Sequence, residues 1–483
     1  EIRGQSSQMF PKKQYGFEIR DENNEGIDVS LLELPEEEDW ILHAPYSDKS
    51  LIRNALIYDL SRSIGRYTSR FRFVELILND SNEGLYILME KLKRDNNRID
   101  INKLKESENE GEDLTGGYIL KIDKNNQYND SNSFISSVAP HSRILFDTPD
   151  EEDITQEQRN YISTYVHDFE TALAADNFTD PAQGYAPYID SDSFIDFFLL
   201  NELSNNVDGF RLSTWVVKDK NKPLSMGPIW DFNLAFGNAD YCDGGITSGW
   251  EVNTGCGDNN PFWFERLLDD TTYQNKLKCR WEYLRERSFH QDSIFTFIDS
   301  MSFYLDDAQQ RNFQQWTILG NYVWPNFYVG NTYQDELQFF KNWIEGRLIW
   351  IDNNIGGNCY EILGCTDLLA CNYDPIANTN DGSCNYNSFS YDTLMSNINI
   401  NWNGWVLTTS GDYSVTLNNS VGCDSIANLS FIFNPLSAIS DFNNQKMLIK
   451  VVDVLGRDNF SYKKTTLFYI YNDGTIEKKN IIE

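Results

Sequence analysis

The chain has 483 residues and a formal net charge of -33 at pH 7, with 40% hydrophobic and 14% aromatic residues. At roughly 150 residues per domain this length predicts about three structural units, and the apolar content excludes general disorder. The negative charge excludes a nucleic-acid partner, because it repels a phosphate backbone. The sequence contains no apolar run of about 18 residues, so we expect no transmembrane segment.

The chain opens with segments that alternate as β-strands do. Glu1, in place of a starting methionine, indicates that the chain begins after processing or truncation, with any signal peptide upstream. Apolar and polar residues alternate over 17–20 and 71–78, which predicts half-buried strands. The polar turn 79–84 and the apolar run 85–89 complete a hairpin with the second of these strands.

Apolar residues at helical spacing mark segments between and after these strands. They predict helices at 48–64, 191–203, 275–287 and 333–351. Asp48 is suited to cap the first helix, and the second is apolar enough to be deeply buried. Strands followed by helices predict an α+β fold for residues 1–355, in which a small sheet lobe precedes a larger helical lobe.

Short sequence blocks along this body occur in a characteristic order. They are residues 3–7, 10–15, 39–42, 46–50, 84–91, 116–118, 206–211, 226–233 and 236–238. In this order the blocks resemble the CotH family of kinase-like proteins, and they cover nearly all of residues 1–354. The resemblance implies an atypical protein-kinase fold, and some members of the family phosphorylate secreted or coat proteins. It also implies ATP with Mg²⁺ or Mn²⁺ as cofactors and an extracellular or co-exported protein as substrate.

The resemblance assigns the metal site and the catalytic acid to two aspartates. Phosphoryl transfer needs carboxylates that hold the metal and an acid near the acceptor hydroxyl. Asp231, followed by Phe and Asn, resembles the metal-binding Asp of a DFG-like element, and Asp208 lies where a catalytic-loop Asp that also faces the metal belongs. In a purely structural reading, both are turn residues. Where many relatives place a metal-ligating Asn, this chain has Ser213, which offers a hydroxyl but no amide oxygen.

Five residues are candidates for binding the nucleotide. Lys13 shares a strand face with apolar residues and needs a partner, so it is a candidate for the phosphate-binding cation, with Lys121 as its rival. The alternative is that both are ordinary lysines whose aliphatic stems cover apolar surface while the ammonium groups stay in solvent. Ser6 and Ser7 follow a glycine and offer backbone amides to phosphates. Glu90 falls where the resemblance implies a hinge over adenine, and the alternative is a surface charge.

Residues 358–388 differ in composition from the preceding body. The segment is rich in Cys, Asn and Asp, and it resembles a repeat of exported Bacteroidetes proteins. Asn378, Asn380 and Asp381 place oxygen atoms in a tight turn, as calcium loops do; the alternative is a disulfide-stapled turn that needs no ion. Clustered cysteines indicate an oxidising compartment, and a group of four allows three pairings. The clustered cysteines are Cys359, Cys365, Cys371 and Cys384.

The last two segments have the alternating patterns of β modules. Residues 389–435 are similar to adhesin-type β repeats of the same bacteria. Residues 436–483 strongly resemble the type A sorting domain of the type IX secretion system, on the strength of 448–457 and 467–479. This resemblance implies the type IX secretion machinery as a partner. It also implies that the mature protein is secreted or attached to the outer-membrane surface.

Two functional hypotheses follow from these features. The first is a secreted, metal-dependent and ATP-dependent kinase, which the retained Asp208 and Asp231 favour. The second is a non-catalytic surface or adhesion protein that uses a kinase-like fold as a binding scaffold, which Ser213 favours. A titration with ATP and Mg²⁺ or Mn²⁺ distinguishes them, because only a nucleotide-binding body is stabilised by the ligand.

Overall fold

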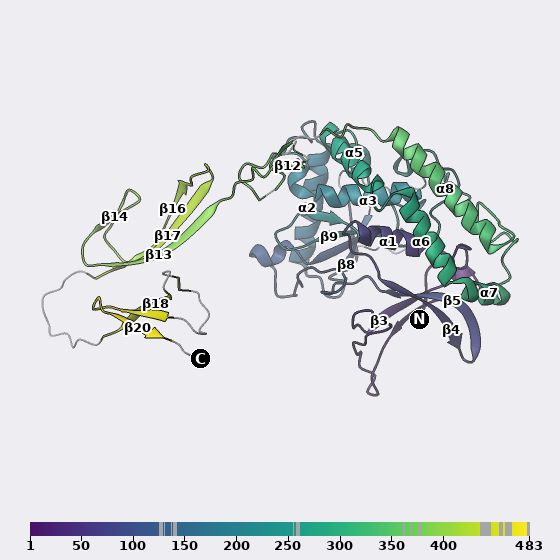
Figure 1. Ribbon diagram of the computed structural model, residues 1–483, viewed down its shortest axis with the longest axis horizontal. Helices are drawn as coiled ribbons and strands as arrows, with labels where there is room; N and C mark the ends of the chain where they lie inside the picture. Colours follow the sequence, from purple (N-terminus) through teal and green to yellow (C-terminus); the bar gives the residue numbers. More distant parts are fainter. Residues whose placement is uncertain are drawn as a thin grey trace. The chain divides into compact units, whose positions relative to one another are not determined.

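Figure 1 shows the fold of the chain in a computed structural model. The structure describes residues 1–124, 129, 131–136, 138, 143–254, 256, 261–360, 363–367, 369–374, 377, 379–434, 446–453, 457–458 and 466–480. The chain divides into two compact units. The first comprises Glu1–Asp367 and Tyr373–Ser383, and the second comprises Leu368–Asn372 and Cys384–Glu483. The predicted boundaries of the individual C-terminal segments stay predictions.

The first unit contains an antiparallel five-stranded sheet with the order β1-β2-β3-β5-β4. Its strands are β1 (Ile2–Arg3), β2 (Gln14–Glu18), β3 (Asp39–His43), β4 (Phe71–Leu78) and β5 (Ser81–Glu90). The predicted hairpin is confirmed, and β4 has the predicted bounds. The turn is shorter than predicted, because β5 already begins at Ser81 and pairs it with Leu78.

A second five-stranded sheet follows, with the order β10-β9-β6-β8-β7. Its strands are β6 (Tyr118–Ile122), β7 (Ser133–Ile135), β8 (Arg143–Thr148), β9 (Thr214–Lys218) and β10 (Leu224–Met226). Helices α2 (Gln156–Ala174) and α3 (Ser191–Ser204) lie between β8 and β9 in the chain. Strands and helices therefore interleave, unlike the predicted order of strands first. Strand β6 is buried at four of its five positions and carries no apolar-polar alternation by which it could be recognised.

Helices complete the first unit around one large apolar core. Besides α2 and α3 they are α1 (Arg53–Ser63), α4 (Trp263–Leu267), α5 (Thr271–Arg285), α6 (Gln291–Tyr304), α7 (Asp306–Gln315) and α8 (Tyr333–Asn354). In Figure 1, α5 and α8 lie on the side of the unit away from β3 and β4, whereas α6 extends toward β4, where the ring of Tyr304 lies 6.4 Å from that of Phe73. The prediction that the helix near residue 191 is deeply buried is confirmed, because every residue from Ser193 to Ser204 is buried. None of the described helices is long and apolar enough to cross a membrane.

Disulfide bonds hold all eight cysteines. Cys242 is bonded to Cys256, Cys279 to Cys359, and Cys371 to Cys423, and Cys365 and Cys384 are bonded as well. The late cysteines therefore do not form a closed group of four, as the sequence suggested. Cys279 in α5 and Cys423 in the β modules lie far along the chain from the cysteines they bond to. The spacing of the late cysteines therefore could not reveal these pairs.

The second unit is built from small sheets. Strands β13 (Ser388–Ser396), β17 (Asp424–Phe433) and β16 (Gly411–Asn418) form one sheet, and β14 (Ile400–Trp402) and β15 (Trp405–Leu407) form a hairpin. A third sheet contains β18 (Leu448–Asp453), β19 (Thr466–Tyr471) and β20 (Ile476–Asn480). Strands such as β16 and β19 confirm the β character predicted for both segments.

The predicted calcium turn is only partly described. Asn378 lies outside the described residues. The side chains of Asn380 and Asp381 accept hydrogen bonds from the backbone N–H groups of Gly382 and Ser383, both at 2.8 Å. These bonds stabilise the turn without an ion, so the calcium site stays a prediction.

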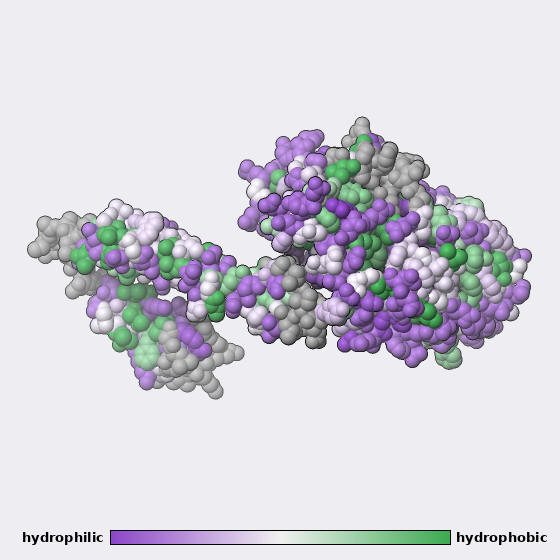
Figure 2. All heavy atoms as spheres, turned by 90° about the horizontal axis from the view of Figure 1, so that it is seen from above, coloured by the Kyte–Doolittle hydropathy of each residue, from purple (hydrophilic) through white to green (hydrophobic). Residues whose placement is uncertain are grey.

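On the face of the molecule shown in Figure 2, hydrophilic residues cover much of the first unit and apolar areas are small and separate, in keeping with the large negative charge.

Candidate functional site

A cavity of about 310 Å³ in the first unit brings together residues from distant parts of the chain. It is lined by the N-terminal loop, by strands β3 and β5, by helix α1, by the loops after β6, α3 and β10, and by the loop before α8. Both Asp208 and Asp231 line it. The charged and polar lining residues used below are Arg3, Ser6, Ser7, Lys124, Asp208, Arg211, Asp231 and Asn233.

The two loops that carry these aspartates have a strained backbone. Asn205, Phe210 and Ser213 in the first loop have φ values of 44°, 66° and 47°. Asp231 and Phe236 in the second have φ values of 67° and 52°. Residues other than glycine rarely adopt this left-handed region. Each one costs about 1–3 kcal/mol of conformational free energy and persists only where the surrounding structure holds it. Of these five residues only Asp231 lines the cavity, so the strain lies mainly in the loops that carry the two aspartates.

Helix α1 holds the second loop in place. The Tyr58 hydroxyl accepts a hydrogen bond from the Asp231 backbone N–H at 3.3 Å, and Asn54 Oδ1 accepts one from the Phe232 N–H at 2.7 Å. Arg53 is buried and donates to the Ala235 carbonyl at 3.1 Å. Asp48 accepts from the Arg53 backbone at 2.9 Å and pairs with its guanidinium at 2.5 Å. The predicted cap was wrong, because α1 begins at Arg53 with Ile52 at its N-cap; Asp48 instead orients the arginine that fixes the loop.

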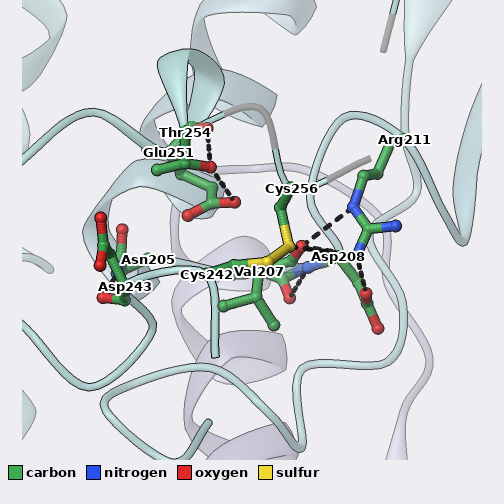
Figure 3. The surroundings of a disulfide bond; sticks show 10 residues. Asn205, Val207, Asp208, Arg211, Cys242, Asp243, Glu251, Thr254 and Cys256 are labelled. Carbon is green, nitrogen blue, oxygen red and sulfur yellow. Dashed lines mark hydrogen bonds and ion pairs between the residues drawn. A yellow bond between two sulfur atoms is a disulfide. The ribbon is translucent and has the colours of Figure 1, made fainter. Parts of the chain in front are cut away.

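The first loop is fixed around Asp208 by Arg211 (Figure 3). Arg211 Nη2 donates to Asp208 Oδ1 at 2.7 Å and to the Val207 carbonyl at 3.0 Å. The same nitrogen lies 3.6 Å from Cys256 Sγ, so the disulfide to Cys242 packs behind this ion pair. Asp208 therefore has one carboxylate oxygen engaged by a neighbouring cation while its side chain still lines the cavity.

Electrostatic repulsion and burial disfavour the charged forms of both aspartates. Burial, and then the charges of Asp208 and Asp123, raise the pKa of Asp231 from 3.8 to about 6, although Lys124 and Lys121 oppose the change. Burial also raises the pKa of Asp208, opposed by Arg211 and Lys124. A cation placed between Asp208 and Asp231 would remove this repulsion. The two carboxylates and the amide oxygen of Asn233 are the hard oxygen ligands that Mg²⁺ and Mn²⁺ prefer.

Besides Arg211, which pairs with Asp208, the cations that line the cavity are Arg3 and Lys124, and neither of these two was predicted from the sequence. Lys124 Nζ donates to Ser6 Oγ at 3.0 Å across 118 residues of sequence. Burial lowers the pKa of Arg3, while nearby carboxylates, among them Asp231, oppose this. Lys124 directly follows a strand and Arg3 precedes Gly4, which are weak signals for a phosphate site.

The two lysines favoured by the sequence are engaged elsewhere. Lys13 Nζ donates to the carbonyls of Gln8 and Phe10 at 2.6 and 2.7 Å, so it stabilises the N-terminal loop. Lys121 pairs with Asp123 at 2.5 Å and lies over the Trp215 ring. Neither is among the described residues that line the cavity. Their proposed contacts with phosphate stay untested, and Lys124 is better placed.

The remaining predicted residues divide between the cavity and its surroundings. Ser6 and Ser7 line the cavity, whereas Ser213 is not among its described lining residues. Glu90 is fully buried and pairs with Arg70 at 2.6 Å, and the preceding residue, Met89, lines the cavity instead. Asn233 supplies the amide that Ser213 lacks, although it comes from the other loop.

Apolar and aromatic side chains form other parts of the cavity wall. Ile41, Met89 and Trp230 line it together with Tyr58, whose ring stacks on Trp230 at a centroid distance of 6.2 Å. Tyr241 and Trp324 also line it, and their rings lie 6.1 Å apart and within 6° of parallel. Such walls suit a planar ring beside a charged group.

Comparison with known proteins bears on the first unit. A family model described as CotH kinase protein matches residues 1–351, which is more than two thirds of the 483 residues. The match includes all the loops that line the cavity. A search of curated proteins gave no match.

Proposed function

Because the chain belongs to the CotH kinase family, we propose that it transfers the γ-phosphoryl group of ATP to a hydroxyl group of an extracellular or co-exported protein. One observation carries the proposal: Asp208 and Asp231, from two separate strained loops, line one cavity with the cations Arg3, Lys124 and Arg211 and with oxygen ligands. We further propose that the first sheet acts as the small lobe of a kinase-like body and that the helices form the larger lobe.

Each requirement of phosphoryl transfer has a residue in the cavity. Asp231 and Asn233, with Asp208, would hold Mg²⁺ or Mn²⁺, which neutralises the phosphate charge that develops in the reaction. Arg3, Lys124 and the N-terminal loop of Ser6 and Ser7 would bind the phosphates. The wall of Ile41, Met89 and Trp230 would hold the adenine ring.

Asp208 is the residue we assign to the acceptor. Its carboxylate takes the proton of the substrate hydroxyl as the new oxygen–phosphorus bond forms and the bond to the β-phosphate oxygen breaks. Arg211 contributes by fixing the rotamer of Asp208 through the 2.7 Å bond to Oδ1. This leaves Oδ2 for the substrate.

A second candidate function is a binding scaffold without catalysis. Two observations favour it: Arg211 already neutralises Asp208, and Ser213 is not among the described lining residues of the cavity. In this case the cavity would bind a ligand but leave it unchanged. Export by the type IX secretion machinery to the surface or the medium is proposed for either function, with the disulfides in support.

The decisive experiment is a thermal and chemical unfolding series with ATP and Mg²⁺ or Mn²⁺. At 100 times the dissociation constant, bound nucleotide should stabilise the parent by about 2.7 kcal/mol. Asp231→Asn should abolish this increment. Asp240→Asn is the matched control, because Asp240 is an exposed acid that accepts a hydrogen bond from Tyr322 and does not line the cavity.

Two outcomes contradict parts of this proposal. An equal increment in the parent and in Asp231→Asn would show that Asp231 does not hold the metal. A parent that is stabilised by nucleotide but transfers no labelled phosphate to co-exported proteins would support the scaffold function instead. Deletion of residues 436–483 tests export separately: truncated protein found outside the cell in normal amounts would contradict the sorting role.

A further inference from the structure

A second cavity, of about 240 Å³, lies where helices α1, α3 and α5 meet. Its lining includes Arg66 just after α1, Asp192 and Asp196 on α3, and Lys276 and Arg280 on α5. None of its described lining residues belongs to the candidate active site. Lys276 and Arg280 are four residues apart on α5, so they lie on the same face of that helix.

A buried carboxylate orients the two arginines of this cavity. Asp196 is 2% exposed. Its Oδ1 accepts a hydrogen bond from Arg280 Nε at 2.7 Å, and its Oδ2 accepts one from Arg66 Nε at 2.7 Å. Arg280 Nη2 also donates to the Ile64 carbonyl at 3.2 Å, which ties the guanidinium to the end of α1. Both arginines are therefore held in one orientation before any ligand binds, which lowers the entropy that binding must overcome.

Donor groups remain free in the cavity. A guanidinium has five N–H donors, and Asp196, the Ile64 carbonyl and Asp190, which lies 3.5 Å from Arg66 Nη1, engage only part of them. The side chains of Arg66 and Arg280 remain 31% and 29% exposed. Lys276 forms no hydrogen bond or ion pair with any residue in the described ranges, although it is half-buried.

The donor groups of the lining, rather than its net charge, suit a small anion. Three cations and two carboxylates line the cavity, the charge of Asp196 is shared between the two arginines that it binds, and Asp190, outside the lining, lies 3.5 Å from Arg66 Nη1. Asp192 is exposed at the first turn of α3 and limits the charge of a ligand that fits. Two guanidinium groups and an ammonium group match the oxygens of phosphate in number and geometry.

We propose that this cavity binds a small tetrahedral oxyanion, either free phosphate or the phosphate group of a phosphorylated side chain. The proposal does not depend on the chemistry of the first cavity. A purely structural ion triad would need Arg66, Asp196 and Arg280 to join three helices, but it would not need Lys276. Lys276 therefore separates the two explanations.

The test measures binding of inorganic phosphate and of O-phosphoserine by calorimetry at constant ionic strength. Lys276→Gln should weaken binding about tenfold, as expected for the loss of one charge-assisted hydrogen bond. Lys278→Gln is the matched control, because Lys278 lies on the same helix, pairs with Glu282 at 3.4 Å and does not line the cavity. Stronger binding of O-phosphoserine would identify a phosphorylated side chain as the ligand, and stronger binding of phosphate would identify the free ion.

The controls make the proposal refutable. Lys124→Gln alters the first cavity and should leave unchanged the loss of affinity caused by Lys276→Gln. This control distinguishes binding in the second cavity from binding in the first. The proposal is overturned if neither probe binds, if Lys276→Gln binds like the parent, or if Lys278→Gln loses as much affinity as Lys276→Gln. Each variant is first unfolded without ligand, and Lys276→Gln should match the parent because its side chain has no partner to lose.

Discussion

Two groups of charged residues in the first unit differ in how completely they are paired. Glu202 and Arg347 are 0% exposed and lie 3.0 Å apart. Glu202 also accepts the backbone N–H groups of Glu251 and Val252, and Arg347 donates to three carbonyls, those of Glu202, Thr247 and Gly249. In contrast, no residue of the described ranges donates a hydrogen bond to the carboxylate of Asp231. The first group is complete as it stands, and the second lacks partners.

This difference separates charges that hold the fold from charges that await a ligand. A buried pair with every polar atom satisfied gains nothing from a further partner, but it is damaged by the loss of either member. Carboxylates that repel one another in a cavity destabilise the empty protein and gain from a bound cation. The comparison thus predicts that a substitution in the paired group lowers the free energy of unfolding, whereas removal of a carboxylate in the second group raises it.

The largest effect is expected at the paired group. Arg347→Met leaves the buried charge of Glu202 without its partner, so the free energy of unfolding should fall by about 3–5 kcal/mol. Arg311→Gln is the control, because Arg311 pairs with Glu75 at 2.7 Å on the surface, where solvent screens the pair and its loss should cost far less. Denaturant unfolding measures both. Equal losses in the two variants would remove the distinction between the groups.

Lys12 is expected to have an effect of intermediate size on the free energy of unfolding, and this effect depends on pH. Its ammonium donates to the Leu85 carbonyl and to Asn312 Oδ1, and burial lowers its pKa from 10.5 to about 7. Between these values the unfolded chain binds more protons than the folded one, so stability rises with pH. Relative to Lys12→Met, the parent should gain about 2–4 kcal/mol between pH 7 and pH 10. Parallel pH profiles of the two proteins would show that Lys12 stays charged in the fold.

The smallest expected effect has the opposite sign. Because the pKa of Asp231 is raised to about 6, the folded protein binds a proton more tightly than the unfolded chain, and stability falls as pH rises from about 4 to 6. Asp231→Asn removes this loss, so the variant without nucleotide should be about 1–3 kcal/mol more stable than the parent at pH 7 and nearly equal to it at pH 4. Urea unfolding at both pH values checks this, and a variant less stable at pH 7 would place Asp231 with the paired group.

The sequence predicted best those features that depend on nearby residues. Strand β4 and helix α3 were recognised because their apolar periodicity or composition is local. Asp208 and Asp231 were found because each lies in a short motif, and both line one cavity. Their chemical roles stay predictions.

Features that depend on distant residues were missed. Lys124 meets Ser6 across 118 positions, and no local pattern marks such a contact. Asp48 was predicted to cap the helix. The sequence did not reveal that Asp48 would orient Arg53, whose guanidinium donates to a carbonyl of the second loop. Cys359 was grouped with its sequence neighbours but is bonded to Cys279, which lies 80 residues earlier. In each case the partner is set by tertiary packing.

The bond between Cys279 and Cys359 determines how the first unit bears mechanical tension. A pull on the chain beyond Cys359 passes through the two sulfur atoms into helix α5, because the covalent path through the disulfide is shorter than the path through the intervening residues. Helices α6, α7 and α8 lie within the closed loop, so such a pull cannot peel them away one by one. A body tethered by its C-terminal side would therefore resist unravelling from that end as long as this disulfide stays oxidised.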